Sequence, residues 1–395
     1  MIDAALYARQ LALPGFGPRS QQALADARVL VIGAGGLGSA VLPALAAAGV
    51  GTIGVVDDDV VERSNLHRQT VHTAADVGRR KVDSAAERLV ALAPGAAVIP
   101  HAERFTAENA LALADDYDVI VDGSDTFATR YLADDVATLS GRPLVWGAVL
   151  AYGGQAGVGR VDGGPGYRDL FPSPPAPETV VDCASGGVLP TVCGIVGSIM
   201  ATEVLKIITG IGTPLTGRVT TYDALSGAFR ELSYAADPAA TPVTGLIDYA
   251  AFCGVAEPDA AASAASAGSA GSAGSAGSAG PVDESDEADP DASELTAPQL
   301  ARRLAADAPP LLIDVREEWE FAIGRIPGAR LVPLGALAAS IAELDPDRPV
   351  VAYCHHGIRS LTALRILRDA GLEAQHLAGG IDAWSVQVDP AVARY

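Results

Sequence analysis

Residues 28–38 read RVLVIGAGGLG, and this stretch decides the fold class of the first half of the chain. Its first five residues are mostly Val, Leu and Ile, which predicts a buried strand, and Gly33, Gly35 and Gly38 predict a tight turn after it. An Ala-rich helix and a strand over residues 52–56 follow, ending at Asp57. The pattern predicts a β–α–β unit in which a phosphate approaches the helix N-terminus and Asp57 accepts hydrogen bonds from ribose hydroxyls.

The glycine turn alone fits NAD and a mononucleotide equally well, but the residues beyond Asp57 favour ATP. Polar and cationic groups are added there by Lys81 and by the segment Ser64-Asn65-Leu66-His67-Arg68-Gln69. A strand over residues 118–121 leads to Asp125, whose carboxylate at the ligand edge of the sheet is suited to Mg²⁺. Arg68, Lys81 and the metal ion would together stabilise charge at the α-phosphate of ATP, as adenylyl transfer requires.

Residues 5–250 resemble the ubiquitin-activating-like adenylyltransferases of the MoeB/ThiF family, which act on small sulfur-carrier proteins. The resemblance rests on Tyr7-Ala8-Arg9-Gln10, residues 33–38, Asp57-Asp58-Asp59, residues 64–69, Lys81, residues 122–125 and residues 183–188, CASGGV. It implies that ATP is contacted by Gly36, Asp57, Asn65, Arg68 and Lys81. It also implies that Asp125 binds the metal ion and that Arg9 reaches into the nucleotide site of a neighbouring subunit, which makes a homodimer.

The sequence departs from this family pattern at two places. Thr126 stands where the family often has Asn, so a hydroxyl replaces an amide near the nucleotide. Many relatives bind structural zinc through two Cys-x-x-Cys pairs, whereas the matching residues here are 166–169, GYRD, and 252–255, FCGV. Because the lone thiol of Cys253 cannot supply the ligands of a tetrahedral zinc site, we expect no zinc.

The other cysteines and two histidines are interpreted from their surroundings. Cys193 lies among apolar residues on a helix predicted over 189–208, and Cys193 and Cys253 are expected to be inert buried thiols. Cys183 precedes that helix in a Gly-rich segment, and the resemblance assigns its position a thiol that attacks the product of sulfur transfer. His67 and His72 are expected to be hydrogen-bonding loop residues. Four scattered cysteines do not make a disulfide framework, which favours free thiols in the cytoplasm.

A second chemical motif lies at residues 354–360, CHHGIRS. Thr296 makes a capping-box start for a short helix, a strand over 311–313 ends at Asp314, and a strand over 349–353 runs into Cys354. A helix predicted over 359–370 begins directly after the loop, so its positive end and the loop N–H groups point at the sulfur, with Arg359 as a further cation. The pattern favours a low-pKa thiolate that carries sulfur as a persulfide over an inert buried thiol.

Residues 294–395 resemble rhodanese-like sulfurtransferases. The resemblance rests on Asp314-Val315-Arg316, Glu320-Phe321, residues 326–329, IPGA, the Cys354 loop and residues 379–384, GGIDAW. The whole chain is similar to the fused adenylyltransferase–sulfurtransferases of the MoeZ type. This implies ATP-dependent adenylylation of the C-terminal Gly-Gly carboxylate of a ubiquitin-like carrier protein. Sulfur from Cys354 then forms a thiocarboxylate, Cys183 cleaves the acyl persulfide, and the sulfur donor is thiosulfate or a persulfide-donor enzyme.

The length and composition predict two or three domains rather than one. The chain has 395 residues, of which 49% are hydrophobic and 19% charged, enough for a large core. Residues 256–293 combine Ser-Ala-Gly repeats with acidic residues, which predicts a flexible, disordered linker with a reach of about 30–35 Å. The linker is expected to join a Rossmann-like, mostly parallel α/β adenylyltransferase domain, residues 1–255, to a small α/β rhodanese-like domain, residues 294–395.

The net charge and the apolar pattern exclude some partners. A formal net charge of −21 argues against nucleic acid. Gly, Pro or charged residues interrupt the apolar stretches before they could span a bilayer, so we expect no membrane. Three other functions stay open: an NAD-dependent oxidoreductase, a stand-alone thiosulfate sulfurtransferase with an N-terminal docking domain, and a scaffold that binds the carrier. The sequence does not identify the carrier, its pathway or the sulfur donor.

Overall fold

The computed structural model describes residues 3–175, 186–254 and 293–394. The chain divides into two compact units, Met1–Gly268 and Ser269–Tyr395. The linker expected over residues 256–293 lies almost wholly outside the described residues. Each unit is therefore considered by itself.

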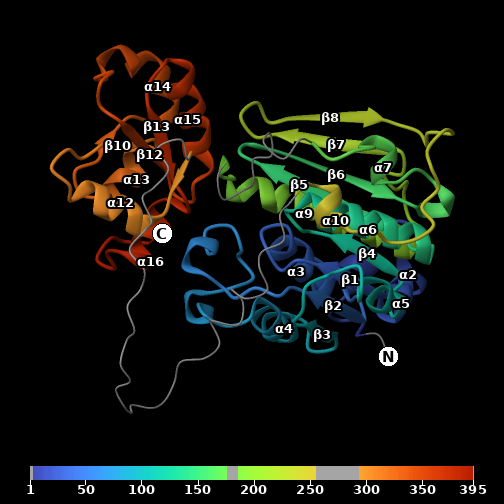
Figure 1. Cartoon of the computed structure of the whole chain (residues 1–395). Coiled ribbons are helices and arrows are strands. Elements are labelled where there is room, and N and C mark those ends of the chain that lie inside the picture. Colours follow the sequence, from blue (N-terminus) through green and yellow to red (C-terminus); the bar gives the residue numbers. More distant parts are fainter. Residues whose placement is uncertain (1–2, 176–185, 255–292, 395) are drawn as a thin grey trace, which may run out of the picture. The chain divides into compact units, whose positions relative to one another are not determined.

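The first unit is built on an eight-stranded sheet with the order β3-β2-β1-β4-β5-β6-β7-β8 (Figure 1). Its parallel half consists of β1 (Arg28–Ile32), β2 (Thr52–Val56), β3 (Ala97–His101), β4 (Val119–Asp122) and β5 (Leu144–Leu150). The antiparallel strands β6 (Gly153–Gly159), β7 (Arg218–Asp223) and β8 (Ala228–Ser233) extend it. The predicted α/β class is confirmed, and the strand predicted over 118–121 begins one residue later.

Helices cover both faces of this sheet, each over its own apolar core. One face is covered by α2 (Gly17–Asp26), α3 (Gly38–Ala48), α4 (Lys81–Leu92) and α9 (Pro190–Thr209). The other face is covered by α5 (Ala110–Asp115), α6 (Phe127–Ser140), α7 (Tyr167–Leu170) and α10 (Tyr249–Phe252). Short helical segments complete the unit: α1 (Ala8–Leu11), η1 (Arg63–Asn65), η2 (Ala74–Asp76) and η3 (Val161–Gly163). Burial on both faces explains why β1 reads as an unbroken apolar run.

The turn from β1 into α3 depends on glycine. A Cβ on Gly38, the first residue of α3, would lie 2.1 Å from the carbonyl oxygen of Gly33, so no larger residue fits there. Gly33 itself has a φ of 92°, in the left-handed region that favours glycine. The backbone N–H of Ala34 donates to Asp57 Oδ2 at 2.8 Å, which ties the turn to the end of β2.

Helix α9 corrects one expectation. An 18-residue window of this 20-residue helix has a mean hydropathy of 1.7, so by length and composition it could cross a membrane, although the sequence pattern suggested that Gly, Pro or charged residues interrupt every such stretch. The helix packs against β5, β6 and α3, and Val192, Val196 and Met200 lie in the apolar core. These contacts make α9 a core helix of the first unit.

The second unit is a five-stranded parallel sheet with the order β11-β10-β12-β13-β9. The strands are β9 (Glu294–Leu295), β10 (Leu311–Asp314), β11 (Arg330–Leu331), β12 (Val350–Tyr353) and β13 (Ala374–Leu377). The helices are α12 (Ala297–Leu304), α13 (Glu318–Ile323), α14 (Leu334–Ser340), α15 (Ile358–Asp369) and α16 (Gly380–Gln387), with the turn η5 (Ile341–Glu343). Thr296 and Gln299 form the predicted capping box before α12. Strand β12 ends directly before Cys354, as predicted.

Candidate active sites

A cavity of about 1840 Å³ opens at the carboxyl ends of the parallel strands in the first unit. The predicted residues that line it are Gly33, Gly35, Gly36, Asp57, Arg68, Lys81, Asp125 and Thr126. Gly38, Ser64, Asn65, Leu66 and His67 do not line it, and neither does Arg9 on the exposed helix α1. The structure therefore brings together the glycine turn, the ribose carboxylate, two cations and the expected metal ligand.

Lys81 and Asp57 form the charged centre of the cavity. Lys81 is buried at the start of α4, and its Nζ lies 2.7 Å from Asp59 Oδ2, whose side chain is 64% exposed. Burial raises the pKa of Asp57, and the nearby Lys81 ammonium opposes that rise. Besides Ala34, the backbone N–H of Asp59 donates to Asp57 Oδ1 at 2.9 Å. Both oxygens of Asp57 thus accept backbone hydrogen bonds, which fixes the orientation of the carboxylate.

The polar side chains of residues 62–68, in the turn after β2, mainly form hydrogen bonds within that turn. The backbone N–H of Glu62 donates to Asn65 Oδ1 at 3.1 Å, so this amide caps η1. The Ser64 carbonyl accepts a hydrogen bond from Arg68 Nη1 at 3.2 Å and lies 2.9 Å from Nδ1 of His67. His67 is a hydrogen-bonding loop residue, as predicted. Of residues 64–68, Arg68 alone lines the cavity.

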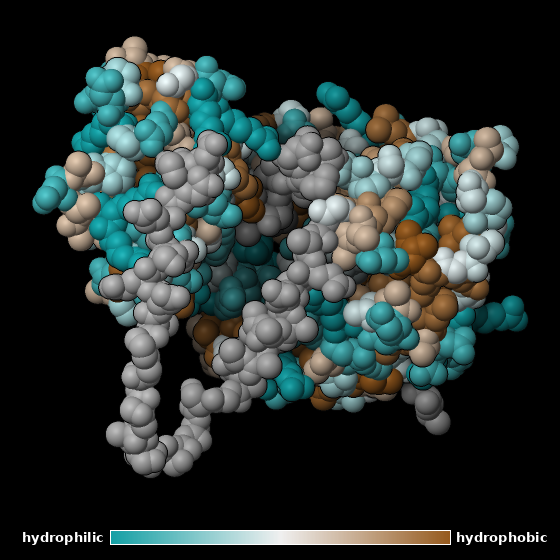
Figure 2. All heavy atoms as spheres, in the orientation of Figure 1, coloured by the Kyte–Doolittle hydropathy of each residue, from teal (hydrophilic) through white to brown (hydrophobic). Residues whose placement is uncertain are grey.

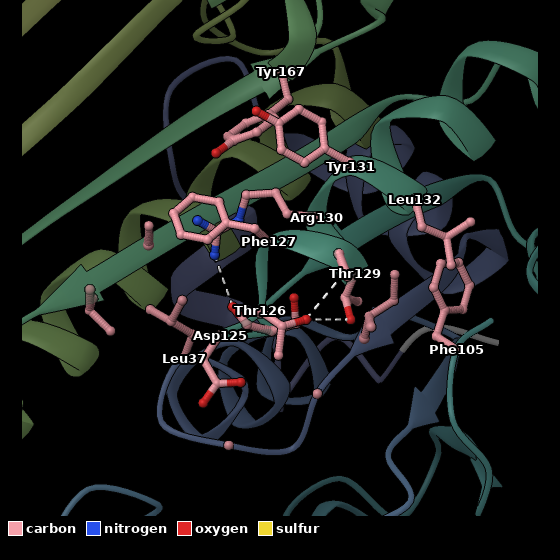
Figure 3. A pocket seen from close by; sticks show the side chains of 18 of the residues that line it. Leu37, Phe105, Asp125, Thr126, Phe127, Thr129, Arg130, Tyr131, Leu132 and Tyr167 are labelled. Atoms are coloured by element: carbon pink, nitrogen blue, oxygen red, sulfur yellow. Dashed lines mark hydrogen bonds between the residues drawn. The ribbon is translucent and has the colours of Figure 1, made fainter. Parts of the chain in front are cut away.

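Asp125 follows β4 and is exposed to the cavity (Figure 3). A carboxylate in an open polar cavity is a suitable ligand for Mg²⁺, which keeps most of its other ligands as water or phosphate. Thr126, which replaces the family's Asn, is the N-cap of α6, and its Oγ1 accepts the N–H of Thr129 at 3.2 Å. The Thr126 hydroxyl thus caps the N-terminus of α6 beside the cavity.

Arg130 lines the cavity although the sequence pattern gave no reason to single it out. Its Nε donates to Asp122 Oδ2 at 3.2 Å, and its Nη2 donates to the carbonyls of Ser124 at 3.0 Å and Gly147 at 2.9 Å. The guanidinium therefore joins the loop before Asp125 to β5 (Figure 3). Asp122, Ser124 and Gly147 are eight, six and seventeen residues away in sequence, too far for a local pattern to reveal.

The cysteines of the first unit agree with the predictions where they are described. Cys193 and Cys253 are buried free thiols, and burial raises the pKa of each. Cys193 lines the cavity from α9, close enough to Gly36 that a Cβ added there would lie 2.9 Å from its Sγ. Cys183 lies outside the described residues, so its role stays a prediction.

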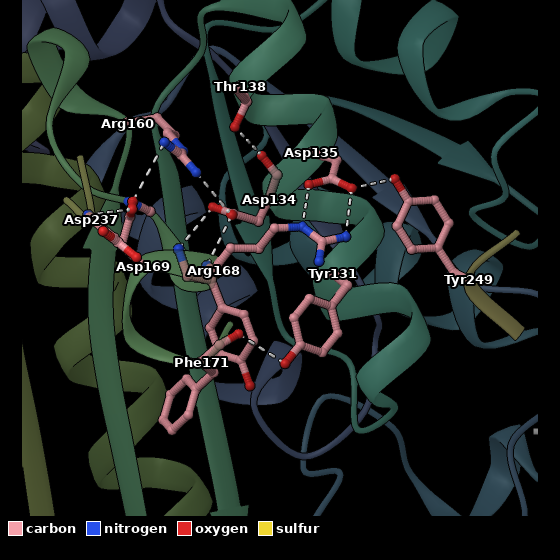
Figure 4. A network of polar contacts seen from close by, with 12 residues as sticks. Tyr131, Asp134, Asp135, Thr138, Arg160, Arg168, Asp169, Phe171, Asp237 and Tyr249 are labelled. Atoms are coloured by element: carbon pink, nitrogen blue, oxygen red, sulfur yellow. Dashed lines mark hydrogen bonds and ion pairs between the residues drawn. The ribbon is translucent and has the colours of Figure 1, made fainter. Parts of the chain in front are cut away.

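The positions where many relatives bind zinc form an ionic and aromatic cluster (Figure 4). Arg168 donates to both oxygens of Asp135 at 2.6 and 2.8 Å, and the Tyr249 hydroxyl donates to the same carboxylate at 2.6 Å. The Arg168 guanidinium also lies 4.8 Å from the ring centres of Tyr131 and Phe252. The group of three possible metal ligands found among the described residues is elsewhere, at Asp57, Asp58 and Asp59. The absence of zinc stays a prediction.

In the second unit, Cys354 is 1% exposed at the base of its loop. The N–H of Gly357, which has a φ of 100°, donates to Cys354 Sγ at 3.2 Å. The Ser360 hydroxyl lies 3.7 Å from the same sulfur and 3.3 Å from Nδ1 of His376. The N–H of Gly357 thus points at the sulfur at the N-terminus of α15, while the Ser360 hydroxyl donates to the Gly357 carbonyl at 2.8 Å and can accept from the Cys354 thiol.

The charged and aromatic side chains around this loop are paired. Arg359 donates to both oxygens of the buried Glu320 at 2.6 and 2.7 Å, so its positive charge is balanced. The rings of His355 and His356 stack with centres 4.0 Å apart. Burial, with the neighbouring His356, lowers the pKa of His355 to about 4. Glu320 belongs to a motif recognised in the sequence, but no local pattern predicts that Arg359 is its partner.

Two family models match the chain. One is described as the ThiF family and matches residues 7–242, and the other is described as the rhodanese-like domain and matches residues 296–387.

Known proteins match along the same regions. A protein of Mycobacterium tuberculosis named "Probable adenylyltransferase/sulfurtransferase MoeZ" is 44% identical over 400 residues, which cover 100% of this chain and 95% of that protein. "Adenylyltransferase and sulfurtransferase MOCS3" of Sus scrofa is 38% identical, over 98% of this chain and 87% of its own. "Sulfur carrier protein adenylyltransferase" of Thermus thermophilus is 48% identical, over 63% of this chain and 96% of its own. The crystal structure of Escherichia coli MccB with ATP has a TM-score of 0.53 at 20% identity, over 59% of this chain and 73% of that chain, which shows a shared fold.

Proposed function

The chain belongs to the ThiF family and carries a rhodanese-like domain, and we propose on this premise that it converts the C-terminal carboxylate of a small carrier protein into a thiocarboxylate. It is an ATP-using adenylyltransferase and a sulfurtransferase, as its full-length relatives are named. The name of the Thermus relative supports a sulfur-carrier protein as the partner. We place the two domains at residues 1–255 and 294–395.

The first reaction takes place in the cavity of the first unit. A carboxylate oxygen of the carrier's Gly-Gly end attacks the α-phosphorus of ATP, the bond to the bridging oxygen breaks, and pyrophosphate leaves. The glycine turn presents N–H groups to the phosphates, Asp57 holds the ribose, and Lys81 exchanges the exposed Asp59 for phosphate oxygens. Asp125 would hold Mg²⁺, which neutralises charge on the triphosphate when bound. The product is an acyl-adenylate, which has a good leaving group.

The second reaction takes place at Cys354. The terminal sulfur of its persulfide attacks the acyl carbon and AMP leaves, giving an acyl persulfide. The Cys183 thiolate attacks Cys354 Sγ and breaks the sulfur–sulfur bond to the acyl group, which releases the thiocarboxylate and forms a Cys183–Cys354 disulfide. An external thiol reductant reopens it. The Gly357 N–H points at Cys354 Sγ, where it would stabilise the thiolate that accepts sulfur from the donor.

The subunit arrangement and the surroundings belong to the same proposal. We propose a homodimer in which Arg9 reaches the partner's nucleotide site. Phe229 and Leu232 are 55% and 57% exposed on the edge strand β8, and Figure 2 shows apolar patches on the visible face of the first unit, as an oligomer would cover. We also propose a soluble cytoplasmic enzyme without zinc that acts on neither nucleic acid nor membrane. Thiosulfate or a persulfide-donor enzyme would supply the sulfur.

The observation that carries the proposal is the presence of two sites in one chain. One is a cavity lined by the glycine turn and the cations Arg68 and Lys81, and the other is a buried cysteine, Cys354, that accepts a hydrogen bond from Gly357 N–H. The test is mass spectrometry of candidate Gly-Gly carriers after incubation with the enzyme, Mg·ATP and thiosulfate. We expect one oxygen to be replaced by sulfur and pyrophosphate to be released. Pyrophosphate release without sulfur gain would leave only adenylylation, and neither change on any carrier would refute the proposal.

A further inference from the structure

A buried histidine lies beneath the glycine turn and takes no part in the chemistry described above. His72 Nε2 lies 3.0 Å from the carbonyl oxygen of Ala34, and its Nδ1 lies 2.9 Å from Ser84 Oγ. His72 is 5% exposed and Ser84 is 3% exposed. The imidazole therefore bridges the turn between β1 and α3 to the first turns of α4.

The Ala34 carbonyl fixes one proton of this ring. A carbonyl oxygen can only accept, so Nε2 carries a proton, and in the neutral ring Nδ1 accepts from the Ser84 hydroxyl. Burial lowers the pKa of His72, and Lys81 lowers it further, while Asp76 and Asp57 oppose the change. The neutral ring with Nε2–H is the form that satisfies both neighbours.

His72 connects the glycine turn to the start of α4, which carry the groups proposed to bind the phosphates. Both backbone groups of Ala34 are held, because its N–H donates to Asp57 Oδ2 at 2.8 Å and its C=O accepts from His72. The next two residues along the chain, Gly35 and Gly36, line the cavity. On the other side, Ser84 lies one helical turn after Lys81 on α4. Rotation of the Ala34–Gly35 peptide, which the His72 contact opposes, would turn the Gly35 N–H of the glycine turn away from a bound phosphate.

We propose that His72 is a positioning residue of the adenylylation site, which keeps the glycine turn and Lys81 in one geometry for Mg·ATP. This role of His72 rests on the proposed function, because it concerns the site where ATP would react with the carrier. Its measurements do not need the carrier protein, so the two can fail separately. If no carrier gains sulfur, the effect of His72 on ATP affinity still stands or falls by itself.

The first test compares two amide variants of the full-length chain. The amide of His72→Gln can donate to the Ala34 carbonyl from near the Nε2 position, whereas the amide of His72→Asn ends near Nδ1 and loses that bond. We expect the Kd of Mg·ATP, measured by calorimetry, to rise about tenfold in His72→Asn and to stay within about threefold of wild type in His72→Gln. Both variants remove the ring, so a merely structural role would weaken both equally.

Two further measurements keep the inference testable if a variant fails to fold. Long-range ¹H–¹⁵N spectra of the histidine-labelled wild-type chain should show one ring in the Nε2–H form that changes when Ser84→Ala removes its donor. Sulfur transfer from thiosulfate to cyanide by Cys354 should be unchanged in every variant. Equal affinities of His72→Gln and His72→Asn for Mg·ATP would overturn the proposal, and so would a His72 ring in the Nδ1–H form.

Discussion

At the scale of single residues, Gly36 and Cys193 meet between the glycine turn and α9. A Cβ on Gly36 would lie 2.9 Å from Cys193 Sγ but 3.5 Å from Cys193 Cβ, so the sulfur atom alone makes a serious clash. We expect Gly36→Ala to destabilise the first unit by about 1–3 kcal/mol. The double variant with Cys193→Ala should recover most of this loss, as measured by thermal unfolding.

The single variant Cys193→Ala is the matched control for this pair. It removes the same sulfur without adding a methyl group, so its own loss reports only the small cavity it leaves. A double variant no more stable than Gly36→Ala would mean that the turn rejects the methyl group for another reason. The affinity for Mg·ATP, measured on the same samples, shows whether the added methyl group also obstructs the phosphates.

His355 gives a pH prediction at the same scale. Its pKa is about 4 in the folded chain against an ordinary value of 6.5, so between these values the unfolded chain binds a proton that the folded chain does not. This contribution to stability is fully present above about pH 6.5 and is lost as the pH falls toward 4. We expect the melting temperature of the second unit to be lower at pH 5 than at pH 7. His355→Gln, which cannot take the proton, should show a smaller decrease.

The difference between the two chains is the quantity that tests this prediction. Carboxyl groups such as Asp382, whose pKa is lowered by Arg394, also contribute to the loss at low pH, but they are present in both chains. If wild type and His355→Gln lose the same number of degrees between pH 7 and pH 5, the folded-state pKa of His355 is not lowered.

At the scale of elements, the Asp135 carboxylate joins α6 to α7 and α10 (Figure 4). Burial and the adjacent carboxylate keep the pKa of Tyr249 above its usual value, so its hydroxyl stays a donor. Asp135→Asn leaves the Arg168 guanidinium without its ion pair and should destabilise the first unit by about 3 kcal/mol. Tyr249→Phe removes one hydrogen bond and should cost about 1 kcal/mol. Both values are measured by calorimetric unfolding.

The cluster of Asp135, Arg168 and Tyr249 also predicts that this region needs no metal ion for stability. Because side chains connect α7 to α10 directly, a zinc chelator should leave the melting temperature of the wild-type chain unchanged. A fall in melting temperature on chelation would show that a metal ion contributes to this region after all. An Asp135→Asn chain as stable as wild type would show that the ion pair adds nothing.

The elements also show which parts of the site can be read from sequence. The strand, glycine turn, helix and Asp57 were predicted in register because each signal is local: an apolar run, a left-handed glycine and a carboxylate at a strand end. The partners of Asp135 were not predicted, since Arg168 lies 33 residues away and Tyr249 lies 114 residues away. Arg359 was predicted as a cation near Cys354, but Glu320, 39 residues earlier, balances its charge. Pairings set by tertiary packing leave no local pattern.

At the scale of the whole molecule, the proposed adenylylation and the loading of Cys354 with sulfur use separate units, so each can be removed without the other. Cys354→Ala should keep carrier-dependent pyrophosphate release and lose thiocarboxylate formation. Asp125→Ala should lose pyrophosphate release by at least about a hundredfold and keep sulfur transfer from thiosulfate to cyanide. If Asp125→Ala still forms the thiocarboxylate, the first unit is only a docking domain.

Mixing these two variants tests whether one chain can supply sulfur to an acyl-adenylate made on another. We expect the mixture of Cys354→Ala and Asp125→Ala to form some thiocarboxylate, because each variant keeps the unit that the other lacks. Units joined in one chain meet at an effective concentration on the order of millimolar, far above that of separate chains in an assay. Dilution of the mixture should therefore lower the thiocarboxylate formed per chain, whereas dilution of wild type with saturating carrier should not. A mixture that forms none at any concentration would show that transfer occurs only within one chain.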